Sequence, residues 1–426
     1  MSKNPTKRVE LLSPAGNFEK LKIALAYGAD AVYGGVSHFS LRIRSSREFS
    51  YESFKEAIDY THDLGKKIYV TVNGFPFNNQ LKLMGEHIEK MAAMGPDALI
   101  VSTPGVIKMA REIAPQIPLH LSTQANVLNY LDAEVYYEMG VSRIIAAREV
   151  SLKDLIGIKK HLPDLELEIF VHGSMCFAYS GRCLISTLQS GRVPNRGSCA
   201  NDCRYDYTLY AENPDNGMLM KIEQDENGTH IMNAKDMNMS AHIDEILASG
   251  VIDSLKIEGR TKSPYYAAIT ARTYRQAIDD YYAGKFRAQK YEEELLTTKH
   301  RGFTDAYLFQ RPHEREDTQN LETAISEGTY EVSGLVTEAG DRFMCKFTTR
   351  PEVPVELIFP AGKEAVAAEN EIGKIYEERG RWYILFHKIV TETGKELQSV
   401  HSGYTVPIML PAPLPPFSIM RQRIHP

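Results

Sequence analysis

Short apolar runs alternate with stretches of helical period along the first two thirds of the chain. The runs are rich in Val, Ile and Leu, as strands of a parallel sheet are when helices cover both of its faces. We predict strands at Val9–Leu12, Ala31–Gly34, Lys67–Val72, Ala98–Ser102, Leu119–Ser122, Arg143–Ala146, Leu167–His172, Ile231–Asn233 and Ser254–Glu258.

Amphipathic stretches separate these runs, and several begin or end at residues typical of helix termini. Asn17 and Ser151 can cap the first turn of a helix, and Gly28, Gly65 and Gly140 follow helical stretches as C-terminal glycines do. The predicted helices are Asn17–Tyr27, Tyr51–Leu64, Gln80–Met94, Val106–Ala114, Leu131–Met139, Ser151–Lys160, Met239–Ala248 and Pro264–Ala283.

Regular alternation of strands and helices predicts a parallel sheet. About eight such units indicate an α/β fold, a (β/α)8 TIM-barrel-like domain over residues 8–325. A doubly wound open sheet is the alternative, although the sequence lacks the GxGxxG fingerprint of its dinucleotide-binding members.

The pattern changes after about residue 325, where short apolar runs are separated by Gly, Pro and charged turns. These runs predict a small all-β barrel domain over residues 328–410. Its expected strands are Tyr330–Thr337, Arg342–Thr348, Val355–Phe359, Trp382–Leu385 and Gly403–Ile408. Residues 411–426 are rich in Pro and are expected to form a non-helical tail.

Composition narrows the class of protein. The chain has 426 residues, of which 43% are hydrophobic and 24% charged, as in ordinary globular proteins. Its net charge of -6 excludes a globally basic nucleic-acid-binding protein but leaves room for a local basic face. The start of the chain lacks the apolar core of a signal peptide, and prolines interrupt the two longest uncharged stretches. We expect a cytoplasmic protein without membrane partners.

Four of the five cysteines fall between residues 176 and 203, with the spacing C-x6-C-x15-C-x3-C. In a chain without a secretory signal, such a group indicates metal ligands or catalytic thiols before disulfides. Structural zinc sites favour Cys pairs two to four residues apart, and only Cys199 and Cys203 approximate one. Iron–sulfur clusters tolerate varied spacing. An iron–sulfur cluster and a zinc site both remain open for Cys176, Cys183, Cys199 and Cys203.

The strand before these cysteines presents an acid and an imidazole. Strand alternation places Glu168, His172 and Cys176 on one face if the strand continues that far. Chemistry in a TIM barrel takes place at the carboxyl ends of the strands. We therefore predict Glu168 and His172 as catalytic residues, with a buried, hydrogen-bonded pair that orients the barrel mouth as the alternative.

Several long motifs resemble blocks of one known family. VHGSMCFAYSGRCLIS and the following NRGSCANDCRYDY resemble the signature of the family called peptidase U32. ELLSPAGNFEKLKIALAYGADAVYGG near the start, and IMNAKDMNM, SLKIEGRTKSPYY and HRGFTDAYL later, resemble further family blocks, so the resemblance covers nearly the whole chain. In the last block Ala306 stands where relatives commonly have glycine.

Within this family the chain most resembles members that use prephenate to make 5-hydroxyuridine at the wobble position of tRNA. Relatives modify 23S ribosomal RNA or hydroxylate ubiquinone precursors, and the ubiquinone members lack a C-terminal β domain. The family's four cysteines hold a 4Fe–4S cluster, and the four clustered cysteines of this chain match them one by one. The resemblance thus implies an RNA-modifying hydroxylase with an iron–sulfur cluster, the tRNA anticodon arm as partner and prephenate as co-substrate.

Polar residues follow several predicted strands, where a barrel places its substrate and catalytic groups. Lys256 and Glu258 are predicted as catalytic residues, in addition to the acid and imidazole above. The basic residues after the last strand lie beside Tyr265 and Tyr266, a combination that suits an extruded uridine; each alone can equally belong to a charged helix start. The predicted substrate-binding residues are Gln124, Asn126, Arg148, Arg182, Asn233, Lys235, Asp236, Arg260 and Lys262, while Asn73 and Ser122 also follow strands.

A peptidase is the alternative function. Some family members are described as collagenases, and a Cys or Ser nucleophile could meet His172 in space. The sequence contains neither an HExxH zinc helix nor a GxSxG elbow, the two most recognisable hydrolase motifs. A protein substrate, and a hydrolytic metal site, are expected only under this alternative.

Overall fold

The computed structural model describes most of the chain. The residues described are 8–36, 49–176, 178–179, 183, 185–192, 199–205, 207–212, 214–215, 217, 219–222, 234–310, 318, 320 and 326–424. Within these ranges, no helix is both long enough and apolar enough to cross a membrane.

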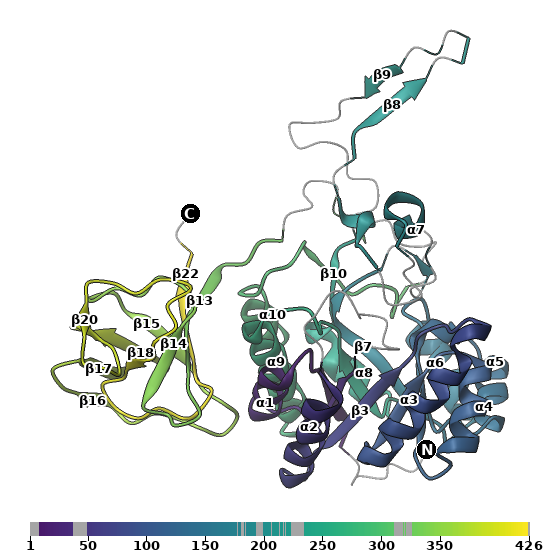
Figure 1. Cartoon of the computed structure of the whole chain (residues 1–426), viewed down its shortest axis with the longest axis horizontal. Coiled ribbons are helices and arrows are strands. Elements are labelled where there is room, and N and C mark those ends of the chain that lie inside the picture. The colour runs from purple at the N-terminus through teal and green to yellow at the C-terminus, as the bar shows by residue number, and fades with distance from the viewer. Residues whose placement is uncertain are drawn as a thin grey trace.

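Eight parallel strands close into a barrel (Figure 1). Seven follow one another around it and the eighth, β11, pairs with both β7 and β1, which closes the circle. The barrel strands are β1 Glu10–Pro14, β2 Ala31–Gly34, β3 Lys67–Val72, β4 Ala98–Val101, β5 Leu119–Leu121, β6 Arg143–Ile145, β7 Glu166–Ser174 and β11 Ser254–Ile257. The TIM-barrel prediction is confirmed, and the open doubly wound sheet is wrong.

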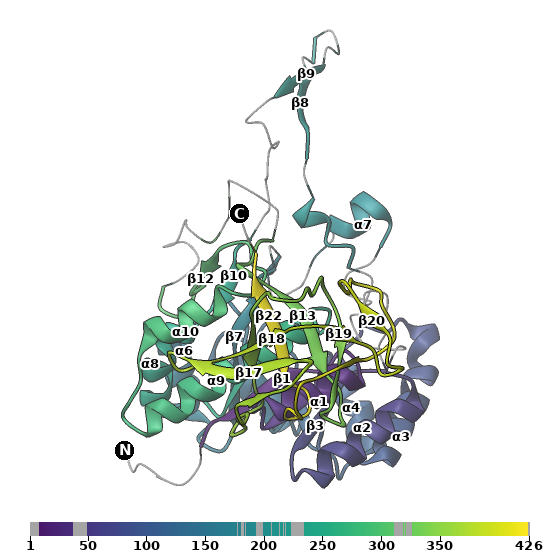
Figure 2. The ribbon, with the colours of Figure 1, turned by 90° about the vertical axis from the view of Figure 1, so that its left-hand side faces the viewer.

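Helices cover the outside of the barrel (Figures 1 and 2). The side chains of Asn17, Ser151 and Ser263 each accept a backbone hydrogen bond in the first helical turn, as expected for caps. The α-helices of this region are α1 Phe18–Ala26, α2 Tyr51–Asp63, α3 Leu81–Met94, α4 Pro104–Ile113, α5 Tyr130–Glu138, α6 Leu152–His161, α7 Ile185–Ser190, α8 Ile243–Ala248, α9 Pro264–Tyr282 and α10 Ala288–Leu295. Short 3-10 helices are η1 Asn78–Gln80, η2 Thr123–Ala125, η5 Asp202–Arg204 and η6 Ser240–His242.

Three further pieces of β structure belong to the mouth of the barrel. Strand β10, Asp236–Asn238, pairs antiparallel with the last residues of β7, and β12, Phe303–Thr304, pairs with β10. The hairpin of β8, Leu209–Glu212, and β9, Leu219–Ile222, projects away from the barrel in both views (Figures 1 and 2). The predicted strand Ile231–Asn233 lies outside the described residues.

The C-terminal region forms a separate curled antiparallel sheet, as the all-β prediction required. Its strand order is β16-β17-β18-β15-β22-β13-β14-β21, and β19 and β20 form a small ribbon beside it. The strands are β13 Tyr330–Val336, β14 Arg342–Cys345, β15 Val355–Ile358, β16 Ala368–Glu369, β17 Gly373–Glu378, β18 Arg381–Phe386, β19 Ile389–Val390, β20 Glu396–Leu397, β21 Ile408–Met409 and β22 Ile419–Arg423. The sheet has its own apolar core around Phe343, Ile384 and Phe386.

Strand β22 shows how the Pro-rich end is arranged. Residues 411–426 were expected to form a non-helical tail that packs back or extends from the protein, and β22 packs back between β13 and β15 in the middle of the sheet. The predicted strand Gly403–Ile408 is reduced to β21, Ile408–Met409. The exact limits of the two predicted domains stay a prediction.

The sheet packs against the barrel through buried polar contacts. The Tyr27 hydroxyl, at the end of α1, donates to the carbonyl oxygens of Ile358 and Phe417 at 2.8 and 3.0 Å. Arg421 of β22 reaches Glu294 of α10 at 2.8 Å and Glu356 of β15 at 3.0 Å. The arginine side chain is only 2% exposed, so these bonds tie β22 to the barrel.

Candidate active site

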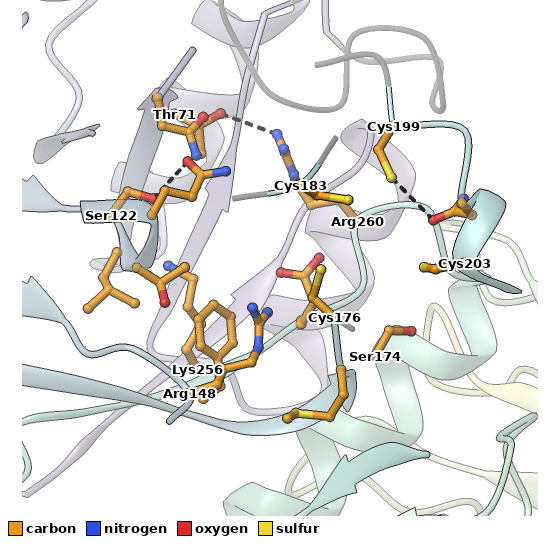
Figure 3. Close-up of a pocket in the computed structure, with 18 of the residues that line it drawn as sticks. Thr71, Ser122, Arg148, Ser174, Cys176, Cys183, Cys199, Cys203, Lys256 and Arg260 are labelled. Atoms are coloured by element: carbon orange, nitrogen blue, oxygen red, sulfur yellow. Dashed lines mark hydrogen bonds between the residues drawn. The ribbon is translucent and has the colours of Figure 1, made fainter. Parts of the chain in front are cut away.

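A cavity of about 150 Å³ lies at the carboxyl ends of the barrel strands (Figure 3). A cavity of this size holds one benzene-like ring. Its walls come from strands β2 to β7 and β11 and from the Cys-containing segment after β7. Its charged and amide lining residues are Asn73, Gln124, Arg148, Asn201, Arg204, Lys256, Glu258 and Arg260, and its thiols are Cys176, Cys183, Cys199 and Cys203.

Lys256 lies at the bottom of this cavity, and the residues beneath it fix its position. Its Nζ donates to Oε1 of the fully buried Glu168 at 2.7 Å and lies 4.3 Å from the centre of the Tyr33 ring. Burial lowers the pKa of Lys256, and the Glu168 carboxylate opposes that shift. The predicted catalytic acid Glu168 does not line the cavity, so it acts as a positioning residue for this cation.

Arg143, which the sequence reasoning missed, joins Glu168 to the bottom of the barrel. Its guanidinium donates to Glu168 Oε2 at 3.1 Å and to Glu10 Oε1 at 2.6 Å. Burial disfavours its charge, but the carboxylates of Glu168 and Glu10 outweigh burial and raise the pKa of Arg143. The hydroxyl of Tyr69 donates to the other oxygen of Glu10 at 2.6 Å. The sequence feature that could have identified Arg143 is a charged residue at the start of a short buried strand.

The side wall of the cavity carries two further cations. Arg260 donates to Oγ1 of Thr71 at 3.2 Å, and Arg148 lies over the Phe170 ring, 4.0 Å from its centre. Glu258 accepts from the Tyr33 hydroxyl at 3.2 Å. Figure 3 shows Arg148, Lys256 and Arg260 in the same cavity as the cysteines. The predicted residues Arg148, Lys256, Glu258 and Arg260 are thus brought together.

The four clustered cysteines line this one cavity as free thiols, whereas Cys345 lies buried in the antiparallel sheet. Burial raises the pKa of Cys183 and of Cys203, and Arg204 opposes the shift at Cys203. Four thiols on one wall match the donor set of an iron–sulfur cluster. As they stand, the described His, Cys, Asp and Glu residues form no group of three or more that could hold a metal ion.

His172 lies away from the cavity. Its Nδ1 is 3.3 Å from the hydroxyl of Tyr274 on α9, and the Tyr266 and Phe303 rings pack beside it. Burial lowers its pKa to about 3. The ring is thus buried and hydrogen-bonded, but to Tyr274, whereas Glu168 bonds Lys256 and Arg143. The structure does not bring His172 together with the thiols, and its catalytic role stays a prediction.

Several predicted substrate-binding residues lie outside the cavity lining. Asn126 donates to the Tyr179 carbonyl at 3.4 Å, and Asp236 forms a buried ion pair with Arg301 at 2.7 Å. Asp236 was expected after a barrel strand, but it begins β10, which runs antiparallel to β7 above the barrel. Lys235 precedes β10, and burial lowers the pKa of Lys262. The predicted residues Arg182 and Asn233 lie outside the described residues.

Comparisons with known proteins give a consistent result. A family model described as peptidase family U32 matches residues 16–318. The chain is 62% identical over 419 residues to tRNA hydroxylation protein P of Helicobacter pylori (strain ATCC 700392 / 26695), covering 98% of this chain and 99% of that protein. It is 42% identical over 355 residues to tRNA hydroxylation protein P of Escherichia coli (strain K12), covering 74% and 78%. It is also 32% identical over 313 residues to a collagenase of Porphyromonas gingivalis (strain ATCC BAA-308 / W83), covering 70% and 73%.

Proposed function

The chain belongs to peptidase family U32, and we propose that it takes part in hydroxylating C5 of the wobble uridine of tRNA, with prephenate as co-substrate. Two relatives whose alignments cover 98% and 74% of the chain are named tRNA hydroxylation protein P. The observation that carries the proposal is the cavity, which combines four thiols with cationic and amide side chains at the mouth of a barrel.

The four thiols suit an iron–sulfur cluster. Cys176, Cys183, Cys199 and Cys203 would hold it as thiolates, and neighbouring Arg204 would help to balance their charge. Such a cluster supplies redox or Lewis-acid chemistry that no amino-acid side chain provides.

The cations of the cavity suit a carboxylate ligand. Arg148 and Arg260 offer planar guanidinium groups that bind carboxylates in a bidentate manner, and Lys256 adds a compact positive charge. Glu168 and Arg143 below keep Lys256 in place. We propose these three cations as the ligands of the anionic groups of prephenate.

The barrel mouth suits a base extruded from an RNA loop. Enzymes that modify a base bring it into a small pocket and pay the cost of unstacking, which is least in single-stranded loops. The chain has a net charge of -6, so contacts to the anticodon arm would be local, in part from the appended antiparallel sheet.

Nucleoside mass spectrometry of total tRNA tests the proposal. Deleting the gene should lower 5-hydroxyuridine and its derivatives, and the wild-type gene, but not a Cys183→Ser copy, should restore them. If the modification persists in a strain that lacks any redundant pathway, the proposal is wrong.

The cluster is tested on the purified protein. Protein prepared without oxygen should be brown and contain iron and sulfide, and Cys183→Ser should lose the visible absorbance. Exposure to air should bleach the protein, because thiolate clusters are sensitive to oxidation. A full complement of tightly bound zinc from cells grown without oxygen would instead support a structural or hydrolytic site.

A peptidase is the second candidate, because one relative is named a collagenase. The imidazole that a Cys or Ser nucleophile would need was expected at His172, and that ring is packed against Tyr274 instead. Cleavage of gelatin by purified protein, abolished by His172→Ala in a folded variant, would favour the peptidase and contradict the hydroxylase.

A further inference from the structure

One wall of the cavity presents a buried acceptor that has no partner. Asn73 directly follows β3 and is 9% exposed, and its Oδ1 atom has no hydrogen-bond partner among the described residues. A buried amide oxygen left without a donor is destabilising. Because Asn73 lines the cavity, turning its amide so that Oδ1 faces the cavity lets a ligand supply the missing donor.

A second amide on the same wall is held in one orientation. Gln124, after β5, accepts at Oε1 from the hydroxyl of Ser102 at 3.0 Å and from that of Ser122 at 3.3 Å. Two donors on the oxygen identify that end of the amide, so Nε2 is the donor end. An amide nitrogen carries two hydrogens, so Gln124 can donate to a ligand as well as to a protein group.

The two amides are coupled through one serine. The Ser102 hydroxyl, directly after β4, lies 3.0 Å from both the backbone carbonyl oxygen of Asn73 and Gln124 Oε1, and these two acceptors share its single proton. Strands β3, β4 and β5 are neighbours in the barrel, so three adjacent strand ends set the positions of these groups. The result is an acceptor beside a donor on a wall built from rigid elements.

We propose that Asn73 and Gln124 read the edge of a uracil ring, Asn73 Oδ1 accepting from N3–H and Gln124 Nε2 donating to the adjacent carbonyl oxygen. This inference rests on the proposed function and assigns the specificity of its site. Cytosine presents an acceptor at N3 and an amino donor at C4, which is the opposite pattern. The amide pair therefore rejects cytosine by placing acceptor against acceptor.

The rest of the cavity agrees with a pyrimidine. The side chains of Ile100, Ile145 and Phe170 contribute apolar surface for the faces of a flat ring. The volume of about 150 Å³ has room for a six-membered ring.

Binding of synthetic anticodon stem–loops to the full-length protein tests the inference. Three loops differ only at the wobble position, which is uridine, cytidine or N3-methyluridine, the last lacking the N3–H donor. Wild-type protein should bind the uridine loop about tenfold or more tightly than the other two loops, because each of those lacks the N3–H donor and loses one buried hydrogen bond. Asn73→Ala should bind the uridine and N3-methyluridine loops with similar affinity, and Gln124→Glu should lose the preference for uridine over cytidine.

Stability separates base reading from structural damage. The Oδ1 atom has no partner to lose, so Asn73→Ala should leave the thermal unfolding midpoint unchanged or raise it. Ser333→Ala is the matched control, because Ser333 Oγ in β13 is also buried and unpartnered in the described part of the chain but lies in the antiparallel sheet. That variant should keep the wild-type preference for uridine.

Each other outcome has a defined meaning. If Asn73→Ala keeps the preference for uridine over N3-methyluridine, or if wild-type protein does not distinguish the three loops, the inference is overturned while the hydroxylation proposal stands. If wild-type protein binds none of the loops although it is folded and loaded with iron and sulfide, recognition of the anticodon arm fails, and the inference falls with it.

Discussion

Two arginines in this chain are each buried between two carboxylates. They differ in which residues those carboxylates contact in turn. Arg143 lies inside the barrel between Glu10 and Glu168, and Arg421 lies between Glu294 and Glu356 where β22 meets the barrel. Both side chains are almost fully buried. In both cases carboxylates outweigh burial and raise the pKa of the guanidinium.

The difference lies in what each cluster reaches. The Arg143 cluster continues through Glu168 to Lys256, which lines the cavity. The Arg421 cluster reaches the hydroxyls of Tyr265 and Thr297 and, through Glu294, the side chain of Arg272 at 3.8 Å. A buried ion pair by itself is therefore no sign of a functional site, and contact with the cavity that holds the four thiols is the feature that distinguishes the two.

The largest expected effect is on stability, at the junction. Arg421→Met removes the buried partner of Glu356 and Glu294 and leaves them only the longer contacts to Arg381, at 3.6 Å, and Arg272, at 3.8 Å. We expect the free energy of unfolding to fall by about 3–5 kcal/mol, measured by guanidinium denaturation. A loss below about 1 kcal/mol would show that the pairs are replaced by water at little cost.

Changing the Arg143 cluster is expected to alter the pKa of Lys256. Burial already lowers the pKa of Lys256 below its ordinary value of 10.5, so the ammonium loses its proton as the pH rises towards that value. Glu168→Gln removes the carboxylate that opposes this shift and leaves Arg143 to repel the ammonium. The pKa of Lys256 should therefore fall further below its ordinary value, which NMR of ¹⁵N-labelled lysine would follow.

Arg421→Met is the control for that measurement, since it should leave the titration of Lys256 unchanged. An unchanged pKa in Glu168→Gln would mean that Glu168 does not hold the charge of Lys256, and the contrast between the two clusters would then disappear.

His172 is a buried group whose pKa is lowered by burial, although the Asp236 carboxylate opposes that shift. Its pKa is about 3 in the folded protein and about 6.5 when unfolded, so below pH 6.5 the unfolded chain takes up a proton that the folded chain does not. Stability should therefore fall as the pH drops from 6.5 towards 3, by about 2 kcal/mol between pH 6.5 and pH 5. His172→Gln should flatten this part of the stability profile, measured by urea denaturation at several pH values.

An exposed ion pair gives the smallest effect. Lys55 and Asp59 are paired one helical turn apart on α2, and both side chains are about half exposed. Lys55→Ala should change the free energy of unfolding by about 0.5 kcal/mol or less, because solvent and salt screen the pair. If Lys55→Ala lowered the free energy of unfolding as much as Arg421→Met does, burial would not explain why the exposed pair and the buried network differ.

Periodicity and helix caps were sufficient to predict the barrel from the sequence. Apolar runs, capping residues such as Asn17 and Ser151, and the late change to short strands are local features, and all appear in the structure. The grouping of four thiols in one cavity also followed from their spacing. The central position of β22 could not be predicted, because a prolyl segment gives no local sign of the strands it returns to.

The face on which His172 lies was decided by pairing between distant strands. Alternation alone places His172 with Glu168, but the register between β7 and β11 shifts between Lys256 and Ile257, which face Phe170 and His172. One extra residue in a strand reverses the side-chain alternation beyond it, and His172 lies against α9 instead of the cavity.

What the sequence by itself determined is the set of local elements and the segment that bears the thiols, since these depend on neighbours along the chain. Only the closed barrel decided which polar residues meet: Arg143 with Glu168, and Asn73 with Gln124 through Ser102. Those contacts join the ends of different strands, and their geometry follows from strand order and register, which no short stretch of sequence encodes.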